Sequence, residues 1–235
     1  MQSELNNIGI IGCSNVAVKR FLPALITSNN SKLESIGSRS LAKAKKIASI
    51  YNCLSYGSYT EVFNNPKVNT VYISVPINQR EKLFELAIKY KKNVFCEKPS
   101  FSNLDDAKKY YEIFEKNKLY FFDCWTFKHH TQHQIIQDTL KHKSFGKILS
   151  FESNFTYPKP PTGNIRLNKD LLGGVFYDSA GYPIKASLMF IKSKIDFIFC
   201  QLEYDKILDI DTNAIIIIKF KNGVIAKLMS GYNQN

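Results

Sequence analysis

The sequence predicts an α/β fold: a doubly wound parallel sheet followed by a second α+β domain with a mainly antiparallel sheet. Between residues 8 and 122, short apolar runs alternate with amphipathic segments of helical period, the pattern of parallel strands joined by crossover helices. After Gly146, long alternating segments outnumber helical ones, which is typical of a mainly antiparallel sheet. We therefore expect two domains, an α/β domain at 1–122 and an α+β domain at 123–235.

In the first domain each strand is short, apolar and followed by a helical segment. The run from Val71 to Val75 is nearly continuous in apolar residues, as expected of a strand buried on both faces. Ser102 or Asn103 is suited to cap a helix with Asp105 and Asp106 in its first turn. The expected strands are 8–11, 33–37, 54–56, 71–75, 93–96 and 119–122, and the expected helices are 16–27, 41–51, 59–64, 79–90 and 103–117.

In the second domain Asn222-Gly223 separates two alternating runs, the strongest short signal for a hairpin. A loop is expected over 169–174. Helices are expected over 133–143 and 182–191, and strands over 148–157, 195–203, 214–220 and 224–228.

The composition limits the class of protein. The formal net charge is +12 over 235 residues, but no arginine-rich arm or zinc module accompanies it, so a solvated lysine surface is favoured over nucleic-acid binding. The five cysteines are scattered without metal-site spacing, and we expect buried free thiols in a reducing compartment. No signal peptide or membrane-spanning run is found. A cytoplasmic location without a membrane partner is expected.

The segment from Ile8 to Leu25 predicts a strand, a tight turn and a helix. The free N–H groups and positive end of that helix favour a pyrophosphate. The dinucleotide fingerprint G-x-G-x-x-G/A has Gly12, Ser14 and Ala17 at its three positions, so its middle glycine is replaced. The alternative is a strand–turn–helix that binds nothing. The expected phosphate contacts are Gly12, Cys13, Ser14, Asn15 and Val16.

The end of the second strand indicates which dinucleotide is bound. NAD-selective sites place an acid there for the ribose 2′-hydroxyl, whereas this chain has Ser38 and Arg39, with Lys43 one turn later. A hydroxyl and a guanidinium suit a 2′-phosphate. NADP is therefore preferred over NAD, although Arg39 could simply begin a helix. Further cofactor contacts expected at the same edge of the sheet are Val75, Pro76 and Glu97.

Several motifs resemble one known family. They begin with Glu97-Lys98-Pro99 at a strand end and continue in order through the chain. With them the chain resembles the Gfo/Idh/MocA oxidoreductases, which have an amino-terminal Rossmann domain, and within them the sugar-nucleotide 3-ketoreductases of deoxysugar pathways. The later motifs are FKHH (127–130), YPKPP (157–161), NIR (164–166), LLGG (171–174) and YDSAGYP (177–183).

The resemblance implies NADPH-dependent reduction of a keto group on a nucleotide-linked sugar. Lys98 and Tyr182 match the two catalytic positions of the family. The resemblance also implies a cis Lys98–Pro99 bond, no metal, and possible homo-oligomerisation through the second sheet.

The residue types fit that chemistry. A phenol can give its proton to the carbonyl oxygen that gains charge when hydride arrives, and a nearby ammonium favours the resulting phenolate. Each group also has a plainer alternative: Lys98 as a surface lysine, Tyr182 as a packed helix residue, Glu97 as a positioning group and not a ribose ligand.

The expected substrate contacts are Asp178, Arg166 and His129. Asp178 lies one helical turn before Tyr182 and could bind a sugar hydroxyl. Arg166 could contact a substrate phosphate or pair with an acid. For the histidines of this region, a structural or substrate-contacting role is favoured over a metal.

Two departures from the family pattern leave alternatives open. Arg80 stands where many relatives have histidine, so its contact with a ligand is open. The chain ends at Asn235, earlier than relatives, so we expect an incomplete second sheet with an exposed edge. The competing interpretation is a truncated, non-catalytic paralogue that binds a dinucleotide or a sugar nucleotide. A basic nucleic-acid-binding module is remote.

Overall fold

The computed structural model describes residues 5–232, apart from the side chain of Lys143. The chain divides into two compact units, the first ending at Cys124 and the second beginning at Trp125.

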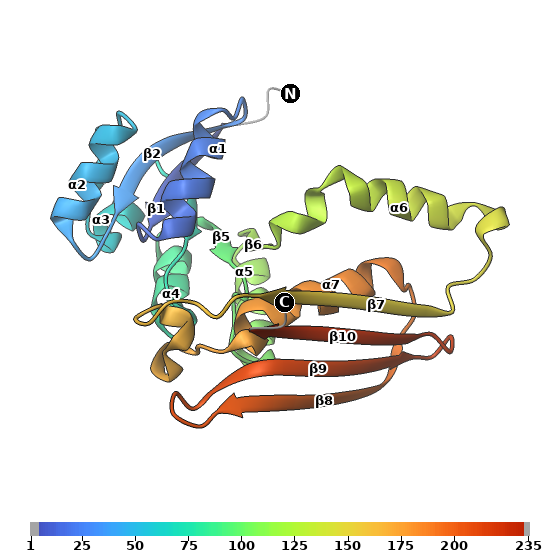
Figure 1. The fold of residues 1–235 in the computed structure, drawn as a ribbon. Coiled ribbons are helices and arrows are strands. Elements are labelled where there is room, and N and C mark those ends of the chain that lie inside the picture. Colours follow the sequence, from blue (N-terminus) through green and yellow to red (C-terminus); the bar gives the residue numbers. More distant parts are fainter. Residues whose placement is uncertain (1–4, 233–235) are drawn as a thin grey trace. The chain divides into compact units, whose positions relative to one another are not determined.

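The first unit is built on a parallel sheet of six strands in the order β3-β2-β1-β4-β5-β6 (Figure 1). Strand β1 pairs with β2 on one side and β4 on the other, so the strand order reverses beside it, where ligands of such sheets bind. The predicted doubly wound fold is confirmed. The strands are β1 (Asn6–Ile11), β2 (Ser31–Gly37), β3 (Tyr56–Gly57), β4 (Thr70–Ile73), β5 (Asn93–Glu97) and β6 (Phe121–Cys124).

Helices pack on both faces of this sheet. In β4, Val71 and Ile73 belong to one core cluster and Tyr72 to another, because successive strand residues point to opposite faces. This burial on both faces explains the continuous apolar run in the sequence. The helical elements are η1 (Ala17–Phe21), α1 (Leu22–Ile26), α2 (Leu41–Ile50), α3 (Tyr59–Asn64), η2 (Ile77–Gln79), α4 (Glu81–Lys89) and α5 (Leu104–Lys116).

Side-chain caps fix where these helices begin. Of the two candidate caps for α5, Asn103 is the residue used: its side chain accepts from the N–H of Asp106 at 2.8 Å. Ser58 and Glu61 form a capping box at α3, in which each side chain satisfies a backbone N–H of the other residue.

The second unit contains a four-stranded sheet in the order β7-β10-β9-β8. Its pairings are antiparallel except for β7 with β10, which is parallel, so the predicted mainly antiparallel sheet is confirmed. The hairpin at Asn222-Gly223 is present, with Gly223 at φ +89°. The strands are β7 (Ser150–Tyr157), β8 (Ile195–Asp205), β9 (Ile210–Phe220) and β10 (Ile225–Tyr232).

Figure 1 shows these four strands side by side, with helix α7 along one face. Apolar residues of β9 and β10 such as Ile216, Ile218 and Leu228 form a core with Ala180 and Ile184 of the helical segment. The helical elements of this unit are η3 (Thr126–His129), α6 (Thr131–Lys141), η4 (Lys143–Phe145), η5 (Ile165–Leu167), η6 (Lys169–Leu171), η7 (Phe176–Ala180) and α7 (Gly181–Phe190).

The loop predicted over 169–174 includes a short 3₁₀ turn, η6. The helix predicted over 182–191 is present as α7, but it is preceded by the helical turn η7, which the sequence did not indicate. Tyr182 therefore lies inside a longer helical segment. The reason is a distant partner, Asp211 of β9, which the local sequence does not reveal.

Asp211 caps the start of this helical segment from the neighbouring sheet. Its carboxylate accepts from the N–H of Phe176 at 2.6 Å, and it also bonds the N–H of Val175. Burial raises the pKa of Asp211, and these backbone donors oppose the rise. Gly174, at φ +108°, gives the carboxylate its room, because a Cβ there would overlap it.

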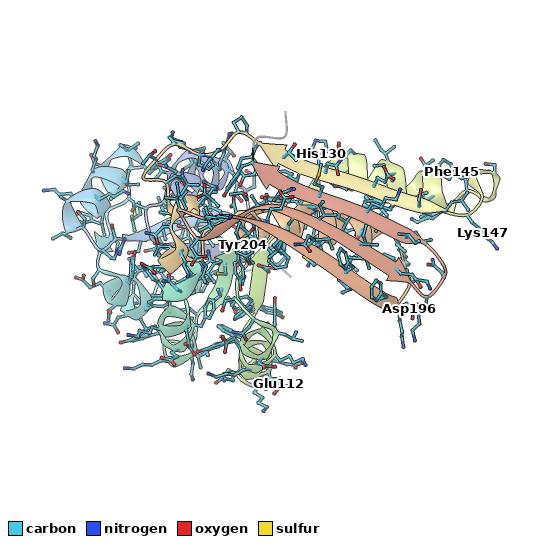
Figure 2. All side chains as sticks on the ribbon, turned by 60° about the horizontal axis from the view of Figure 1, so that its bottom comes forward. Glu112, His130, Phe145, Lys147, Asp196 and Tyr204 are labelled. Carbon is cyan, nitrogen blue, oxygen red and sulfur yellow. The ribbon has the colours of Figure 1, made fainter. Side chains whose placement is uncertain are left out.

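Strand β8 lies at the edge of the sheet, and side chains on both of its faces are exposed. Asp196 and Tyr204 mark its two ends in Figure 2. Phe197 and Ile198, on opposite faces, are each 55% exposed. The expectation that all cysteines are buried was wrong for Cys200, which lies exposed on this strand. Helix α7 packs on β7 and β10, and the edge strand remains uncovered within residues 5–232.

Within the described part of the chain, no helix combines the length and apolar character that crossing a bilayer requires.

Cys200 is expected to be the one thiol of the native protein that reacts rapidly with a maleimide, because Cys13, Cys53, Cys96 and Cys124 are buried. Mass spectrometry of briefly labelled protein should show a single adduct, and the Cys200→Ser variant should show none. Cys53→Ser is the matched control and should keep the adduct. Rapid labelling at two or more sites would contradict the described burial.

Gly174→Ala is expected to lower the free energy of unfolding by at least about 2 kcal/mol, because it combines a strained φ with overlap on Asp211. Gly223→Ala is the control: its φ is also positive, but nothing lies within 4 Å of the added Cβ, so about 1 kcal/mol is expected. Urea unfolding can be followed by Trp125, the single tryptophan, which lies in this unit. Equal losses in the two variants would rule out the overlap.

Candidate functional site

The bend after β1 is fixed by both neighbouring strands. The N–H of Gly12 donates to the carbonyl of Gly37 at 3.0 Å, and Ser74 Oγ donates to the carbonyl of Gly12 at 2.8 Å. Gly12 has φ +95°, and a Cβ there would lie 2.8 Å from a methyl carbon of Val75. Only glycine fits this turn without strain or displacement.

The helical segment that follows begins at Asn15. The Oγ atom of Ser14 accepts from the N–H of Ala17 at 3.1 Å, so this serine caps the helix. Cys13 is buried, whereas Asn15 and Val16 are exposed. The first N–H groups of a helix have no partner within the helix, and together with the positive end they suit an anion. The form of the bend suits a pyrophosphate, and binding of the pyrophosphate by these residues stays a prediction.

The end of β2 presents a hydroxyl and two cations. The Oγ atom of Ser38 accepts from the N–H of Ser40 at 3.2 Å, while Arg39 and Lys43 are exposed. Burial raises the pKa of Tyr59, and the nearby Arg39 guanidinium opposes that rise, so Arg39 lies beside Tyr59. This set of donors fits a ribose 2′-phosphate.

Arg80, whose role the sequence did not settle, holds the structure together from the interior. The residue is 5% exposed. Its guanidinium donates to the carbonyl of Val75 at 2.8 Å, to that of Pro99 at 2.5 Å and to that of Glu97. Arg80 therefore ties the chain after β4 to the chain after β5, and holds in place the two loops to which Pro76 and Lys98 belong.

Glu97 is held by a residue that sequence reasoning missed. The phenol of Tyr72 donates to Glu97 Oε1 at 2.6 Å, and the Tyr72 ring stacks on Phe21 with centroids 3.7 Å apart. Burial, and then the Glu97 carboxylate, raise the pKa of Tyr72, so it remains a donor. The signal in the sequence was a hydroxyl inside the apolar run at 71–75. The expected cis bond between Lys98 and Pro99 is present.

In the second unit, one carboxylate oxygen of Asp178 accepts two hydrogen bonds. Arg166 Nε donates to Asp178 Oδ2 at 2.7 Å and the Tyr157 phenol donates to the same atom at 2.5 Å. Arg166 thus pairs with an acid, the plainer of its two alternatives. Burial and the carboxylate raise the pKa of Tyr157. Tyr157 lay within the YPKPP motif, but sequence reasoning gave it no role.

The histidines of this region differ in exposure and in their partners. His129 is exposed at the end of η3. His130 accepts from the N–H of Gln132 through its Nδ1 atom at 3.2 Å, which explains why α6 begins before the expected position. His133 is buried among Phe127, Phe190 and His130. Among residues 5–232, no group of three His, Cys, Asp or Glu side chains could hold a metal ion.

Tyr182 is surrounded by rings from its own unit: Phe155, Phe127 and Trp125. Lys98 belongs to the first unit and Tyr182 to the second. Their convergence on one ligand stays a prediction, as do the roles of the individual site residues.

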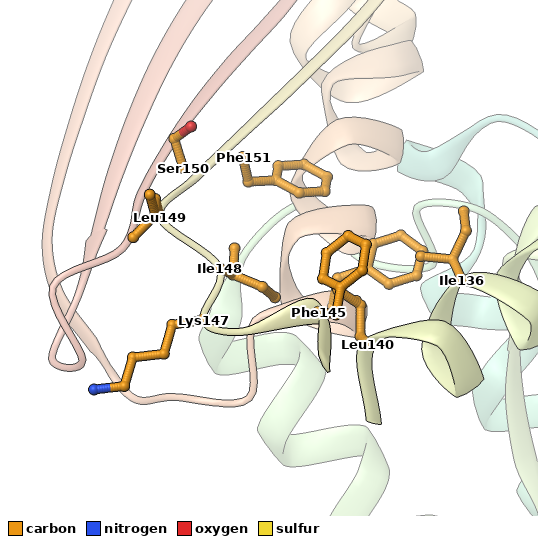
Figure 3. A pocket seen from close by; sticks show the side chains of 9 residues that line it. Ile136, Leu140, Phe145, Lys147, Ile148, Leu149, Ser150 and Phe151 are labelled. Carbon is orange, nitrogen blue, oxygen red and sulfur yellow. The ribbon is translucent and has the colours of Figure 1, made fainter. Parts of the chain in front are cut away.

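A hollow of about 390 Å³ in the second unit is lined mainly by apolar side chains from α6, η4, the segment before β7, β7 itself and α7. In Figure 3, Ile136, Leu140, Phe145 and Phe151 point into it, and Lys147 points away. None of the predicted site residues lines it.

Comparison with known proteins identifies the family. The oxidoreductase family model with an NAD-binding Rossmann fold, Gfo/Idh/MocA, matches residues 6–122, and the model of the C-terminal domain of the same family matches residues 133–235.

The dTDP-3,4-didehydro-2,6-dideoxy-alpha-D-glucose 3-reductase of Actinomadura kijaniata is 28% identical over 224 residues, covering 95% of this chain and 68% of that protein. A solved structure of a 3-ketoreductase from the same organism, in complex with NADP and TDP-benzene, has a TM-score of 0.93 at 27% identity, covering 98% of this chain and 71% of that one. An NAD-binding protein from Listeria innocua, 20% identical with a TM-score of 0.89 over 98% of this chain and 68% of its own, shares the fold.

The two family models together cover both units, and they confirm the resemblance expected from the E-K-P motif. The chain belongs to the Gfo/Idh/MocA family of NAD(P)-dependent oxidoreductases.

Proposed function

We propose that this chain is an NADP-dependent reductase of a keto group on a nucleotide-linked sugar. The observation that carries the proposal is its likeness, at a TM-score of 0.93 and 27% identity, to a 3-ketoreductase in complex with NADP and TDP-benzene. Residues 1–122 would bind the dinucleotide and residues 123–235 the sugar substrate.

The dinucleotide would be held along the edge of the parallel sheet where its strands end. The bend at Gly12 and the N–H groups of residues 13–16 would take the pyrophosphate. Ser38, Arg39 and Lys43 would take the 2′-phosphate, and the absence of an acid after β2 favours NADP over NAD. Val75, Pro76 and Glu97 would line the same edge further along.

NADPH, when bound, supplies the hydride that reduces the carbonyl carbon of the substrate. Tyr182 would donate its phenolic proton to the carbonyl oxygen, which gains negative charge in the reaction. The ammonium of Lys98 would favour the phenolate that results. Glu97, fixed by the phenol of Tyr72, would orient the cofactor ribose or the neighbouring Lys98.

The second unit would supply the contacts that orient the sugar nucleotide. Asp178 is held by Arg166 and Tyr157, one helical turn before Tyr182. It would accept from a sugar hydroxyl, Arg166 would hold the Asp178 carboxylate in place through their ion pair, and His129 would contact the substrate. Assembly into homo-oligomers through the second sheet stays a prediction.

Tyr182→Phe is expected to lower kcat by at least about 100-fold, the usual worth of a general acid, with the Kd for NADPH unchanged. Stopped-flow oxidation of NADPH with a dTDP-linked 3-keto sugar measures the first quantity and nucleotide fluorescence the second. Tyr204→Phe, which removes an exposed hydroxyl on β8, is the control. Wild-type turnover by Tyr182→Phe would exclude Tyr182 as the proton donor. Nucleotide binding without turnover by the wild-type chain would favour a non-catalytic binder.

Arg39→Ala is expected to weaken NADPH binding about 10- to 100-fold, since hydrogen bonds to a charged group are lost. NADH, which has no 2′-phosphate, should bind nearly as before. Isothermal titration with both nucleotides tests this. Lys46→Ala removes a similar exposed charge from the same region and should change neither Kd. Equal losses for NADPH and NADH would show that Arg39 does not bind the 2′-phosphate.

A further inference from the structure

We infer that Phe155 is a positioning residue that fixes the ring of Tyr182 for proton donation. The inference rests on the proposed function. It concerns only residues of the second unit, whose mutual contacts the structure describes.

Three aromatic rings enclose the Tyr182 ring from different directions. Phe155 stacks on it nearly face to face, with centroids 4.6 Å apart and planes 11° apart. Trp125 approaches edge-on at 5.4 Å and 85°, and Phe127 at 5.3 Å and 61°. A tyrosine ring moves by rotation about two side-chain torsions, and these contacts restrict both. The position of the phenolic oxygen is thereby set before substrate arrives.

The backbone of Phe155 is linked by hydrogen bonds, through Ser230 and Ser179, to the helical segment that carries Tyr182. The Ser179 hydroxyl lies 2.5 Å from that of Ser230, and Ser230 Oγ donates to the carbonyl of Phe155 at 3.1 Å. Ser179 is 1% exposed and Ser230 is 0% exposed. Because buried hydrogen bonds are costly to break, β7, β10 and the helical segment are held together at this level of the sheet.

The edge contact from Trp125 depends on the glycine beside Tyr182. A Cβ at Gly181 would overlap the indole ring. Trp125 can therefore reach Tyr182 only because residue 181 has no side chain. The phenol of Tyr182 is therefore positioned by three features: the absence of a side chain at Gly181, the stacked ring of Phe155 and the hydrogen-bonded serine pair.

Burial in the hydrophobic core does not explain why a phenylalanine stands at position 155. Its side chain remains 40% exposed, although it lies on the face of β7 that looks toward the helix. A phenylalanine there gains less from burial than a core residue does. Its most specific contact is the parallel stack on Tyr182.

Phe155→Leu keeps an apolar side chain but removes the ring face. It is expected to lower kcat about tenfold, because small misplacement of a reacting group is costly. The KM for the sugar nucleotide and the Kd for NADPH should change less than twofold. Phe155→Tyr keeps the ring and should restore most of kcat. A purely structural role would change the fraction of folded enzyme and leave kcat per folded molecule unaltered, so urea midpoints are measured alongside.

Phe151→Leu is the matched control. Phe151 lies four residues earlier on β7 and on the same face, but its ring contact is with Phe190 at 6.1 Å. The same substitution there should leave kcat unchanged. If Phe155→Leu proves insoluble, Phe155→Met makes the same comparison with a flexible apolar side chain.

The outcomes separate the inference from the proposed function. If Tyr182→Phe abolishes turnover while Phe155→Leu and Phe155→Met retain wild-type kcat, the inference is overturned and the function stands. An equal fall in Phe151→Leu would also overturn it. If Tyr182→Phe turns over at the wild-type rate, the proposed function itself fails.

Discussion

The parallel pairing of β1 with both β2 and β4 is the constraint on which the first unit depends. It places the Gly12 bend next to the chain that leaves β2 at Ser38 and the chain that leaves β4 at Ser74. Hydrogen bonds from Gly12 to Gly37 and from Ser74 to Gly12 then lock these loops to one another. Because all strands of a parallel sheet end at one edge, residues that are far apart in the sequence, such as Gly12, Ser38 and Ser74, come together there.

Two charged or polar side chains inside this unit have a role other than binding. The Arg80 guanidinium donates hydrogen bonds to three backbone carbonyls, and the Tyr72 hydroxyl donates one to the Glu97 carboxylate. Both are buried, where an unpaired polar group is costly. They therefore make the loops after β4 and β5 rigid, and such rigidity is what a site needs in order to hold a cofactor in one place.

In the second unit, helix α7 has a comparable long-range support. Asp211 on β9 receives the first N–H groups of the helical segment, and Gly174 leaves room for its carboxylate. Farther along the segment, Asp178 is clamped by Arg166 and Tyr157, and Tyr182 is enclosed by three rings. The helical segment that carries Asp178 and Tyr182 is thus held at its start by Asp211 and along its side by residues of the neighbouring elements.

The sequence by itself determined the fold class, because strand and helix periods alternate as the local backbone requires. It also determined the glycine at the bend, the residue types after β2 and the family motifs. It could not determine partners distant in sequence, such as Asp211 for the helix start, Tyr72 for Glu97 or Tyr157 for Asp178. Nor could it show that β8 is an edge strand with Cys200 exposed, since alternation indicates one buried face but not what covers it. Those features were decided only by the tertiary structure. The burial and the partners of a side chain depend on which elements pack together, and hydrophobic periodicity does not indicate which elements these are.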